Sequence, residues 1–501
     1  KSVKAISIIM NYTKKAVSGT SITLLMSVLA AGIAYLTRIV LARNLGPADY
    51  GLFSSVLTFI FFFLFFRDLG LDSSLIKHIA EFRAHNQFNH IKTAISGGFL
   101  FQFVSSLVFS AVFLLLSSFL AENYFKDSRA STLIILVVVY VVFSICFTLL
   151  KGIFSGFQKM FLFSSVEFTK NLIVLVCAFI FFKFGFGIYA PMLAYVVVCP
   201  LLFCIYAPFA SKLSGFFSNK ITDFKLVSKR VVLFGIPLFA TSFAGTIIGY
   251  TDTLILTYFR PLAEVGIYNV VLPSALMILF IGRAVSSTTF PISSELWSRK
   301  DYRRLSAGVS LLHKYSFVCF IPIIFTVFAF SKFFIITFFG AEYQTGSLAL
   351  QILLIGALFF IVAMVNNTVI SAMGQPKIVA KITILAAAVN LSTNMLFIPS
   401  LGINGAAITT TLSYGLVLIL TTVKIQRVLK IRFPLKEWPK QIFAALLFIS
   451  TIFTAKYFLP FSPWYELFIS VFIAITVYLT SLFIFKIIDL QEIKYYWRLL
   501  H

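Results

Sequence analysis

Hydrophobic runs long enough to cross a membrane recur along the whole chain, separated by short polar segments. A membrane-spanning helix needs roughly 20 consecutive apolar residues, and charged residues, Gly and Pro mark the breaks between runs. The intervals at 183–186 and 398–402 are so short that each flanking pair of runs could form one broken helix. The pattern predicts an all-α polytopic membrane protein with about fourteen spans, at 17–42, 50–70, 94–120, 131–155, 162–183, 186–208, 231–258, 265–290, 313–337, 348–373, 377–398, 402–423, 439–459 and 464–486.

The first twelve predicted spans form two copies of a six-span repeat. Shifting the sequence by 215 positions places residues 48–53 (ADYGLF) over residues 263–268 (AEVGIY). Six crossings are an even number, so both copies enter the membrane from the same side and are related by an axis along the membrane normal. We therefore expect two parallel six-helix bundles around a central cavity, with two extra C-terminal helices.

The repeat and the polar segments also predict the domain organisation. The loop at 71–93 places Leu75, Ile79 and Phe82 on one helix face, which is typical of an interfacial amphipathic helix, with a solvated connector as the alternative. The expected parts are an N-terminal bundle at 1–210, a cytoplasmic linker at 211–230, a C-terminal bundle at 231–423, a cytoplasmic loop at 424–438, helices 13 and 14 at 439–486 and a cytoplasmic tail at 487–501.

Composition and charge support the membrane assignment and orient the protein. The chain is 60% hydrophobic with a mean hydropathy of +0.99, which excludes a soluble domain. Of its 41 Lys and Arg residues, thirty-one fall on the side of the termini and seven on the other side. By the positive-inside rule we expect a multi-pass plasma-membrane protein with both termini in the cytoplasm. Since the basic residues lie in short loops, no nucleic-acid partner is expected.

Few ionisable side chains fall within the predicted spans, and each is a candidate functional residue because charge is costly there. The 215-residue shift places Arg38 on Thr253, beside Asp252, and places Asp68 on Arg283. If the two bundles face each other, these side chains approach the cavity from both sides, with the aspartates partly neutralising the arginines. The alternative is that each arginine snorkels or closes a structural salt bridge.

The other candidate functional residues could also have purely structural roles. Glu167 and Lys170 lie three residues apart on one helix face, so they could form an internal ion pair. Uncharged donors at membrane depth could line a polar path or hydrogen-bond between helices. The predicted substrate-binding residues are Arg38, Arg67, Lys170, Tyr250, Arg283 and Asn366, and the predicted ion-coupling or gating residues are Asp68, Glu167 and Asp252.

Catalytic and metal-binding motifs are absent from the sequence. No P-loop, H-E-x-x-H motif or nucleophile elbow occurs, and the histidines form no ligand set. We therefore expect no cofactor, no metal and no enzyme, with transport driven by a proton or sodium gradient or by the membrane potential. A membrane sugar polymerase or ligase would need a sizeable external loop, and the longest predicted ones have about ten residues.

Several segments in order resemble the polysaccharide-synthesis flippases of the multidrug/oligosaccharidyl-lipid/polysaccharide exporter superfamily. They are residues 43–53 (RNLGPADYGLF), 235–237 (GIP), 372–377 (AMGQPK) and 401–407 (LGINGAA). The resemblance implies two bundles around a cavity and alternating access. It also implies an oligosaccharide linked to a polyprenyl or dolichyl phosphate or pyrophosphate, moved to the outer leaflet for cell-surface polysaccharide or glycoprotein synthesis.

Basic side chains at depth suit such a headgroup, because charge interactions strengthen as the local dielectric falls. Two alternatives from the same superfamily stay open: a peptidoglycan-precursor flippase, and a cation-coupled multidrug exporter, for which twelve spans and a more acidic cavity are expected. The expected partners are the lipid-linked oligosaccharide and membrane lipids, with glycan-assembly proteins as candidates, and the expected state is a monomer.

Overall fold

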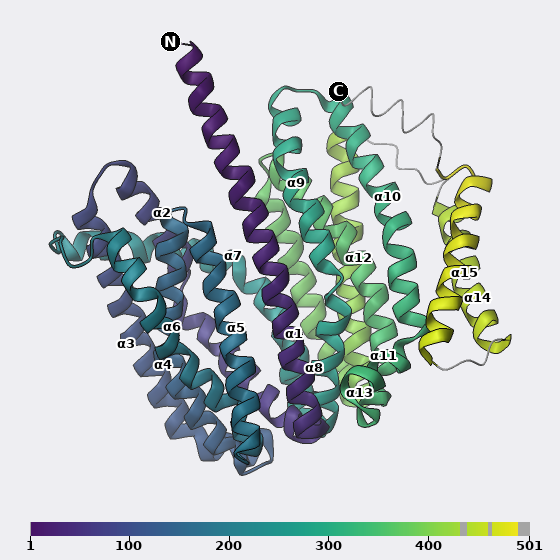
Figure 1. Cartoon of the computed structure of the whole chain (residues 1–501), viewed down its shortest axis with the longest axis horizontal. Coiled ribbons are helices and arrows are strands. Elements are labelled where there is room, and N and C mark those ends of the chain that lie inside the picture. The colour runs from purple at the N-terminus through teal and green to yellow at the C-terminus, as the bar shows by residue number, and fades with distance from the viewer. Residues whose placement is uncertain (1, 431–437, 459–462, 489–501) are drawn as a thin grey trace. The chain divides into compact units, whose positions relative to one another are not determined.

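The structure, a computed structural model, describes residues 2–430, 438–458 and 463–488. Over these residues the chain forms fifteen α-helices joined by short turns (Figure 1). Their bounds are α1 (Ser2–Asp68), α2 (Leu71–Ala84), α3 (Phe88–Leu120), α4 (Arg129–Gly156), α5 (Met160–Lys183), α6 (Ala190–Ser214), α7 (Phe224–Phe259), α8 (Leu262–Leu276), α9 (Leu279–Ser298), α10 (Tyr302–Ala329), α11 (Ser331–Phe339), α12 (Ser347–Ala372), α13 (Pro376–Leu429), α14 (Trp438–Phe458) and α15 (Pro463–Ile484).

The all-helical membrane architecture is confirmed. Within the described residues, eleven helical segments are long and apolar enough to cross a membrane. Two of them contain a kink, at Gly46 in α1 and at Gly402 in α13, where positive φ angles of 72° and 57° interrupt the helix. Glycine tolerates these angles because it has no Cβ. The expected broken helix around 398–402 is therefore present, and the predicted spans 17–42 and 50–70 are joined in the same way.

Two predicted features need correction, whereas a third is kept. The predicted span 265–290 lies within one membrane-length segment, Leu262–Ser298, in which a turn at Met277 and Ile278 separates α8 from α9. The predicted span 313–337 ends at Ala329, and α11 starts afresh at Ser331. Residues 183–186 do not form a broken helix, because a short 3-10 turn at Gly187–Tyr189 separates α5 from α6.

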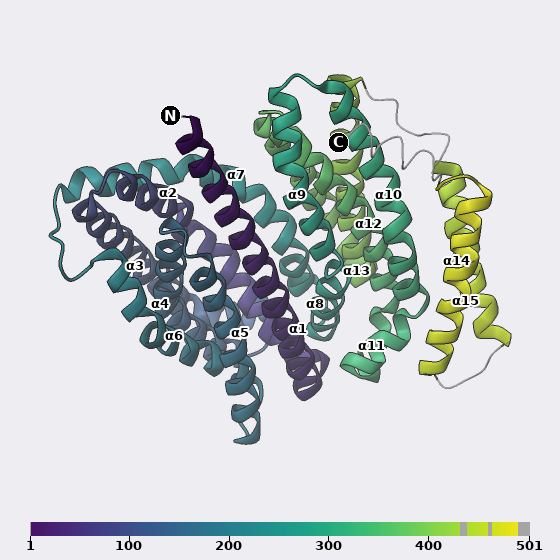
Figure 2. The same ribbon diagram turned by 45° about the horizontal axis from the view of Figure 1, so that its top comes forward.

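The chain forms two compact units, unit 1 at Lys1–Gly266 and unit 2 at Ile267–His501. Helix α7 packs on α1, α2 and α3 in unit 1 (Figure 2). The predicted bundle boundaries stay a prediction. Residues 431–437 of the predicted loop and 489–501 of the predicted tail lie outside the described residues.

Helix α2 corrects the prediction for the loop at 71–93. Its apolar face, formed by Leu75, Ile79 and Phe82, is buried and packs inside unit 1 against α3, α4 and α7. The contact with α4 is close, since a Cβ on Gly156 would lie 2.6 Å from Cγ2 of Ile79. The amphipathic pattern was recognised correctly, but its apolar face is covered by protein, so α2 is neither an interfacial helix nor a solvated connector.

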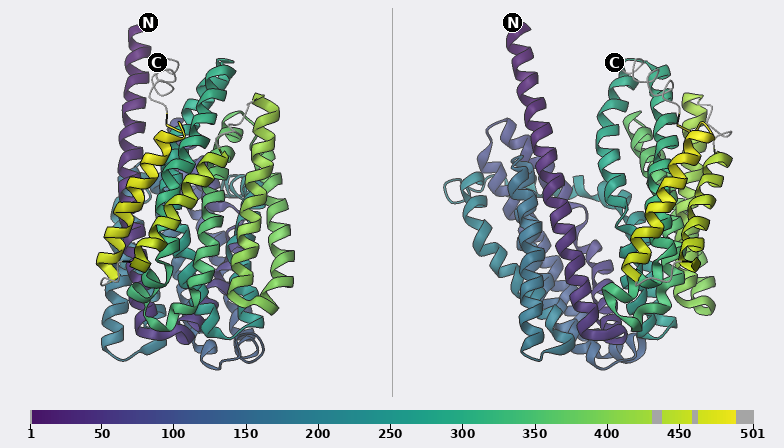
Figure 3. Two further views of the ribbon diagram at one scale, coloured as in Figure 1. Left: turned by 90° about the vertical axis from the view of Figure 1, so that its right-hand side faces the viewer. Right: turned by 45° about the vertical axis from the view of Figure 1, so that its right-hand side comes forward.

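In unit 2, α14 and α15 lie side by side (Figure 3). They attach to α10 and α11 through a hydrophobic cluster that includes Ala444, Phe448 and Tyr478. The hydroxyl of Tyr478 donates a hydrogen bond of 3.2 Å to the carbonyl of Val318 on α10. The two helices outside the sequence repeat are therefore an integral part of unit 2.

Candidate functional site

Within unit 1, α1 and the first residues of α8 meet at a pair of glycines that the sequence repeat aligns. A Cβ on Gly51 of α1 would lie 1.8 Å from the carbonyl oxygen of Leu262, and a Cβ on Gly266 of α8 would lie 2.0 Å from that of Pro47. The same 215-residue shift relates Gly51 to Gly266 and Pro47 to Leu262, so this contact, the glycine contact, has local two-fold symmetry. Glycine is required at both positions because each helix touches the backbone of the other.

Polar bonds fasten the adjoining end of α7 to the same region of unit 1. The hydroxyl of Thr257 donates to that of Ser55 at 3.0 Å, and the hydroxyl of Tyr124 donates to the carbonyl of Leu254 at 2.7 Å. These bonds connect α7 with α1 and with the π-turn Ala121–Phe125. The C-terminal end of α7 is thereby held close to the glycine contact.

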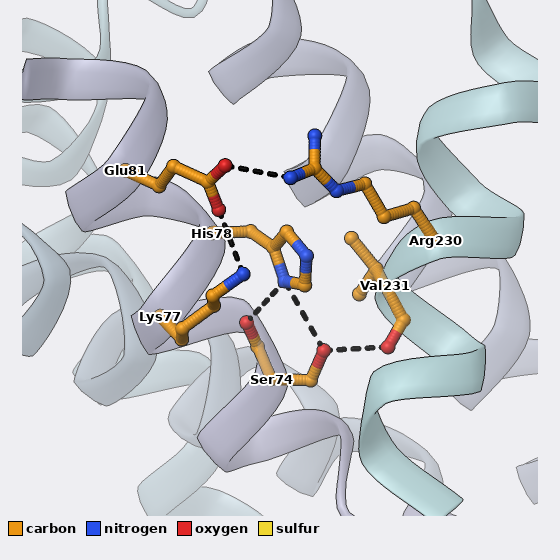
Figure 4. Close-up of polar contacts among 6 residues, drawn as sticks. All are labelled: Ser74, Lys77, His78, Glu81, Arg230 and Val231. Atoms are coloured by element: carbon orange, nitrogen blue, oxygen red, sulfur yellow. Dashed lines mark hydrogen bonds and ion pairs between the residues drawn. The ribbon is translucent and has the colours of Figure 1, made fainter. Parts of the chain in front are cut away.

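At the other end of unit 1, α2 is bound to the beginning of α7 by a polar cluster (Figure 4). The hydroxyl of Ser74 donates to the carbonyl of Val231 at 2.5 Å, and the carboxylate of Glu81 accepts from Arg230 at 2.6 Å and from Lys77 at 2.8 Å. The hydrogen bond from Lys77, together with the charges of Arg230 and Lys77, lowers the pKa of Glu81. We call these five residues the α2–α7 latch.

A second pair of glycines supports the latch. A Cβ on Gly70 would lie 2.3 Å from the carbonyl oxygen of Gly235, and a Cβ on Gly235 would lie 2.5 Å from that of Leu69. Next to it His78 is fully buried, and its Nδ1 lies 2.9 Å from the carbonyl oxygen of Ser74. Burial lowers the pKa of His78 and thereby favours the neutral ring.

Two carboxylates share one amide where α1 passes into α2. The side-chain nitrogen of Gln102 donates to Asp68 at 2.9 Å and to Asp72 at 3.4 Å. Burial of its carboxyl group and the nearby Asp68 raise the pKa of Asp72 to about 7. The residue as a whole is accessible, but protein atoms surround the carboxyl group, and this local environment governs its titration. Asp72 was not singled out in the sequence because it lies beyond the predicted span.

The raised pKa of Asp72 has a testable consequence for stability. The native protein keeps a proton that the unfolded chain releases from pH 3.8 upward, so stability falls as the pH rises toward about 7 and then levels off. We expect Asp72→Asn to flatten this part of the profile when the unfolding temperature is measured from pH 5 to pH 8. The exposed Glu122 provides the control Glu122→Gln. An unchanged profile in Asp72→Asn would disprove the assignment.

Arg67 is buried in unit 1, with 6% of its surface exposed. Its guanidinium donates to the carbonyl of Val141 at 3.0 Å and to the hydroxyl of Ser144 at 3.0 Å. Among the described residues its Nε has no hydrogen-bond partner. The guanidinium of Arg67 is therefore hydrogen-bonded to neutral oxygen atoms of α4, and the carboxylates of Asp68 and Asp72 are within electrostatic range of its charge.

Glu167 and Lys170 form the ion pair that the sequence allowed, at 2.5 Å, and Glu167 has a second partner in Lys151 of α4, at 2.8 Å. The two ammonium groups lie 5.1 Å and 4.6 Å from the ring centre of Phe147. We call Lys151, Glu167 and Lys170 the lysine triad. Its formal charge is +1. The sequence offered no signal for Lys151, because that residue lies sixteen positions before Glu167 on another helix.

The remaining candidates of unit 1 lie on α1 and α7. Arg38 is half-buried, and its Nε donates to the hydroxyl of Tyr50 at 3.3 Å. Tyr250 is half-buried, whereas Asp252 is 1% exposed and lies between two buried threonines on α7. Of the predicted site residues, the structure brings Glu167 and Lys170 into direct contact. The pairing of Arg38 with Asp252 stays a prediction.

Arg283 and Asn366 belong to unit 2. Arg283 is exposed on α9 and lies 5.3 Å from the ring centre of Phe280, and among the described residues no carboxylate is within ion-pair distance. The buried Asn366 is 2.6 Å from His313 and donates to Thr421 and Thr422 at 3.2 Å and 3.0 Å. Asn366 therefore makes the interhelical hydrogen bonds that the sequence left as its alternative role.

An apolar cavity of about 580 Å³ lies in unit 2 beside this hydrogen-bonded group. Side chains of α10, α12, α13 and α14 line it, among them Phe317, Phe325 and Leu446, while His313 and Thr422 provide polar atoms. Such a cavity favours an apolar occupant over water. In the part of the chain that the structure describes, no group of three His, Cys, Asp or Glu residues could hold a metal ion.

Comparison with known proteins identifies the family. Residues 16–297 match the family described as "Polysaccharide biosynthesis protein", and residues 237–396 match the MatE family. An uncharacterized membrane protein of Methanocaldococcus jannaschii, MJ1068, is 29% identical over 97% of this chain and 98% of its own. The probable low-salt glycan biosynthesis flippase Agl15 of Haloferax volcanii is 25% identical over 49% of this chain and 52% of its own.

A putative O-antigen transporter of Shigella flexneri is 26% identical over 74% of this chain and 87% of its own. The fold is similar to that of the lipid II flippase MurJ in an inward closed conformation, with a TM-score of 0.76 and 15% identity over 92% of this chain and 98% of that one.

The fold and these matches define a multi-pass membrane protein of a transporter class, not an enzyme. The chain belongs to the polysaccharide biosynthesis protein family, within the multidrug/oligosaccharidyl-lipid/polysaccharide exporter superfamily, as its motifs predicted.

Proposed function

We propose that this protein moves an oligosaccharide linked to a polyprenyl or dolichyl phosphate or pyrophosphate from the cytoplasmic to the outer leaflet. The observation that carries the proposal is the excess of positive charge in the lysine triad of unit 1. The triad sets two ammonium groups against one carboxylate, whereas the buried Arg67 has the carboxylates of Asp68 and Asp72 within electrostatic range. A membrane interior that keeps unbalanced cations favours an anionic ligand and disfavours the organic cation of a drug exporter.

The relatives support the same substrate class. One is named as a probable glycan biosynthesis flippase and another as a putative O-antigen transporter. A peptidoglycan-precursor flippase is the second candidate, and it is favoured by the similarity to the MurJ fold. Both substrates combine a phosphate-linked sugar with an isoprenoid chain. The apolar cavity of unit 2 suits part of such a chain, because its lining is almost entirely hydrocarbon.

The remaining predicted residues are proposed parts of the same machinery. Arg38, Arg67, Lys170, Arg283 and Tyr250 are the proposed contacts of the headgroup or of the sugar. Asp252, Glu167 and Asp68, the last together with Asp72, are the proposed coupling or gating groups, in exchange with a proton or sodium gradient. The titration of Asp72 near neutral pH supports this role for the carboxylates at the α1–α2 junction.

The proposed topology has fourteen crossings with both termini in the cytoplasm. The kinks at Gly46 and Gly402 divide α1 and α13 into two crossings each, and α7 provides one more beyond the eleven segments. The six-helix repeats enclose the substrate path between them in this proposal. We expect Lys220→Cys and Lys300→Cys to react with an impermeant maleimide only from the cytoplasmic side of oriented vesicles. Labelling of either from outside contradicts the topology.

Alternating access requires contacts that open in turn at the two ends of the substrate path. The glycine contact and the α2–α7 latch lie at opposite ends of the second part of α1. The helix from Gly51 to the end of α1 at Asp68 rises roughly 26 Å at 1.5 Å per residue, which is most of the thickness of the hydrocarbon core. We propose that the glycine contact closes the outer end and that the latch closes the inner end.

Breaking the latch should favour the inward-open state. Val231 is 1% exposed and contributes only its backbone carbonyl to the latch, so a cysteine at this position reports opening. We expect Glu81→Gln, in a Val231→Cys background, to raise the rate of maleimide labelling about fivefold, since a partly exposed ion pair contributes up to about 1 kcal/mol. The ion pair of Glu295 with Arg299 provides the control Glu295→Gln. Equal labelling rates in Glu81→Gln and in this control would rule out a gating role for the latch.

The function itself is testable in cells. A host that lacks its own flippase for a lipid-linked surface polysaccharide should regain that polysaccharide at its surface when it produces this protein, and an added organic cation should not be exported. Restored drug resistance without surface polysaccharide would favour the multidrug exporter instead.

A further inference from the structure

The lysine triad has a geometry that a single ion pair does not explain. Lys151 comes from α4, whereas Glu167 and Lys170 come from α5. Each oxygen of the Glu167 carboxylate has its own ammonium partner, Oε2 with Lys151 at 2.8 Å and Oε1 with Lys170 at 2.5 Å. The side chains of Lys151, Glu167 and Lys170 are 29%, 33% and 18% exposed, so the group is partly buried and still within reach of a ligand.

The carboxylate occupies the place that a phosphoryl group would fit. Two ammonium groups held against two oxygens of one anion form a bidentate arrangement, and a phosphoryl group presents its oxygens in a similar way. Phe147 fixes both ammonium groups from one side, since each lies about 5 Å from its ring centre. The two ammonium groups and one carboxylate leave the triad with a net charge of +1. This net charge favours a ligand with more negative charge than a carboxylate.

We propose that Lys151 and Lys170 bind a phosphoryl group of the transported substrate, and that Glu167 holds this place in the empty protein and gives it up by taking a proton. This inference rests on the proposed function and adds Lys151 to its site. Neutralisation of Glu167 removes its repulsion toward the arriving anion. When the phosphoryl group leaves, Glu167 pairs with both lysines again and returns its proton to the water on the side to which the site is open.

Few other titratable groups surround Glu167. Tyr140 on α4 and Tyr195 on α6 are within electrostatic range of its carboxylate, and Cys199 on α6 is within range of Lys170. On α1, which packs against α5, Arg38 is within range of Tyr195. Phenols and thiols are neutral near pH 7, and Arg38 stays charged. Because the carboxyl group of Asp72, with a pKa of about 7, titrates close to this range, a change in ligand affinity between pH 7.5 and 8.5 is assigned to Glu167 by its loss in Glu167→Gln.

The test measures the binding of farnesyl diphosphate to the purified full-length protein by calorimetry. We expect the affinity of the wild type to rise up to tenfold when the pH is lowered from 8.5 to 7.5, the limit for uptake of one proton. Glu167→Gln should bind more tightly than the wild type at pH 8.5 and should lose this dependence. Lys151→Met, which leaves one lysine paired with one carboxylate, should lose at least about tenfold in affinity.

Lys92 provides the matched control, because it is a lysine of unit 1 that also lies over an aromatic ring, that of Phe216. Lys92→Met should bind like the wild type. Affinity unchanged in Lys151→Met, or a Glu167→Gln protein that unfolds at lower temperature without tighter binding, would show that the triad only joins α4 to α5. Export of glycan by the same Lys151→Met protein at the wild-type rate would overturn this inference and leave the flippase function intact.

Inorganic pyrophosphate and farnesol separate the possible sources of the ligand. Farnesyl diphosphate bound at least tenfold more tightly than pyrophosphate, with no binding of farnesol, supports a lipid-linked headgroup. Pyrophosphate bound as tightly as farnesyl diphosphate would assign the triad to free phosphoryl anions and would overturn its role in substrate binding.

Discussion

The Gly51→Ala and Gly266→Ala variants are expected to be strongly destabilised and to lose transport. The added methyl groups would lie 1.8 Å and 2.0 Å from carbonyl oxygens of the facing backbone, so α1 and α8 must move apart. Overpacking of a close contact typically costs about 1 to 3 kcal/mol. We expect this loss in the thermal unfolding of the purified protein, and a matching loss of export because the outer contact no longer closes.

Gly32 provides a control on the same helix. A Cβ at Gly32 would meet no atom within 4 Å, and exchange of a helical glycine for alanine is otherwise favourable by roughly 0.5 to 1 kcal/mol. Gly32→Ala should therefore unfold at or slightly above the wild-type temperature. If Gly51→Ala unfolds at the same temperature as Gly32→Ala, the close approach of the two helices is not part of the native protein.

The second large effect is expected at Arg283. Arg283→Ala should abolish glycan export. It should change the free energy of unfolding by no more than about 0.5 kcal/mol, because the side chain is exposed and its described contact is the ring of Phe280. Arg283→Lys should keep part of the activity if charge suffices, and little of it if the planar guanidinium must bind two oxygens at once.

Arg299, exposed just beyond the end of α9 and paired with Glu295, provides the control for charge. Arg299→Ala removes the same charge from the C-terminal end of α9, roughly 24 Å along the helix from Arg283, and should export normally. Normal export by Arg283→Ala, or its failure to accumulate in the membrane, would assign Arg283 to the structure of unit 2 and would remove it from the binding site.

Much of the fold could be predicted because membrane-spanning helices are recognisable in the sequence as long hydrophobic runs. The repeat even aligned Gly51 with Gly266, although a sequence shift cannot reveal that two equivalent residues touch each other. Breaks within continuous apolar runs were harder to predict. The turn at Met277 lies inside hydrophobic sequence, where no polar residue marks it, whereas Ser331 and Lys332 follow the end of α10 at Ala329 but were included in the predicted span 313–337.

The candidate site was less predictable, because it depends on contacts between helices. Spacing of three residues revealed Glu167 with Lys170, but nothing local connected them with Lys151 on α4. The amphipathic pattern of α2 identified a helix correctly without indicating what covers its apolar face. The sequence was equally consistent with Asn366 lining a polar path and with Asn366 forming hydrogen bonds between helices. The bonds with His313, Thr421 and Thr422 distinguish these two roles.

The most direct measurement of the central claim is translocation by the purified protein in proteoliposomes. Liposomes would contain a fluorescent polyprenyl diphosphate oligosaccharide, and a membrane-impermeant lectin or glycosidase would report the fraction that reaches the opposite leaflet. The account predicts transfer that depends on the protein, that is lost in Arg283→Ala, and that is not competed by an organic cation. A protein that transports the organic cation and leaves the lipid-linked sugar in its original leaflet would contradict it.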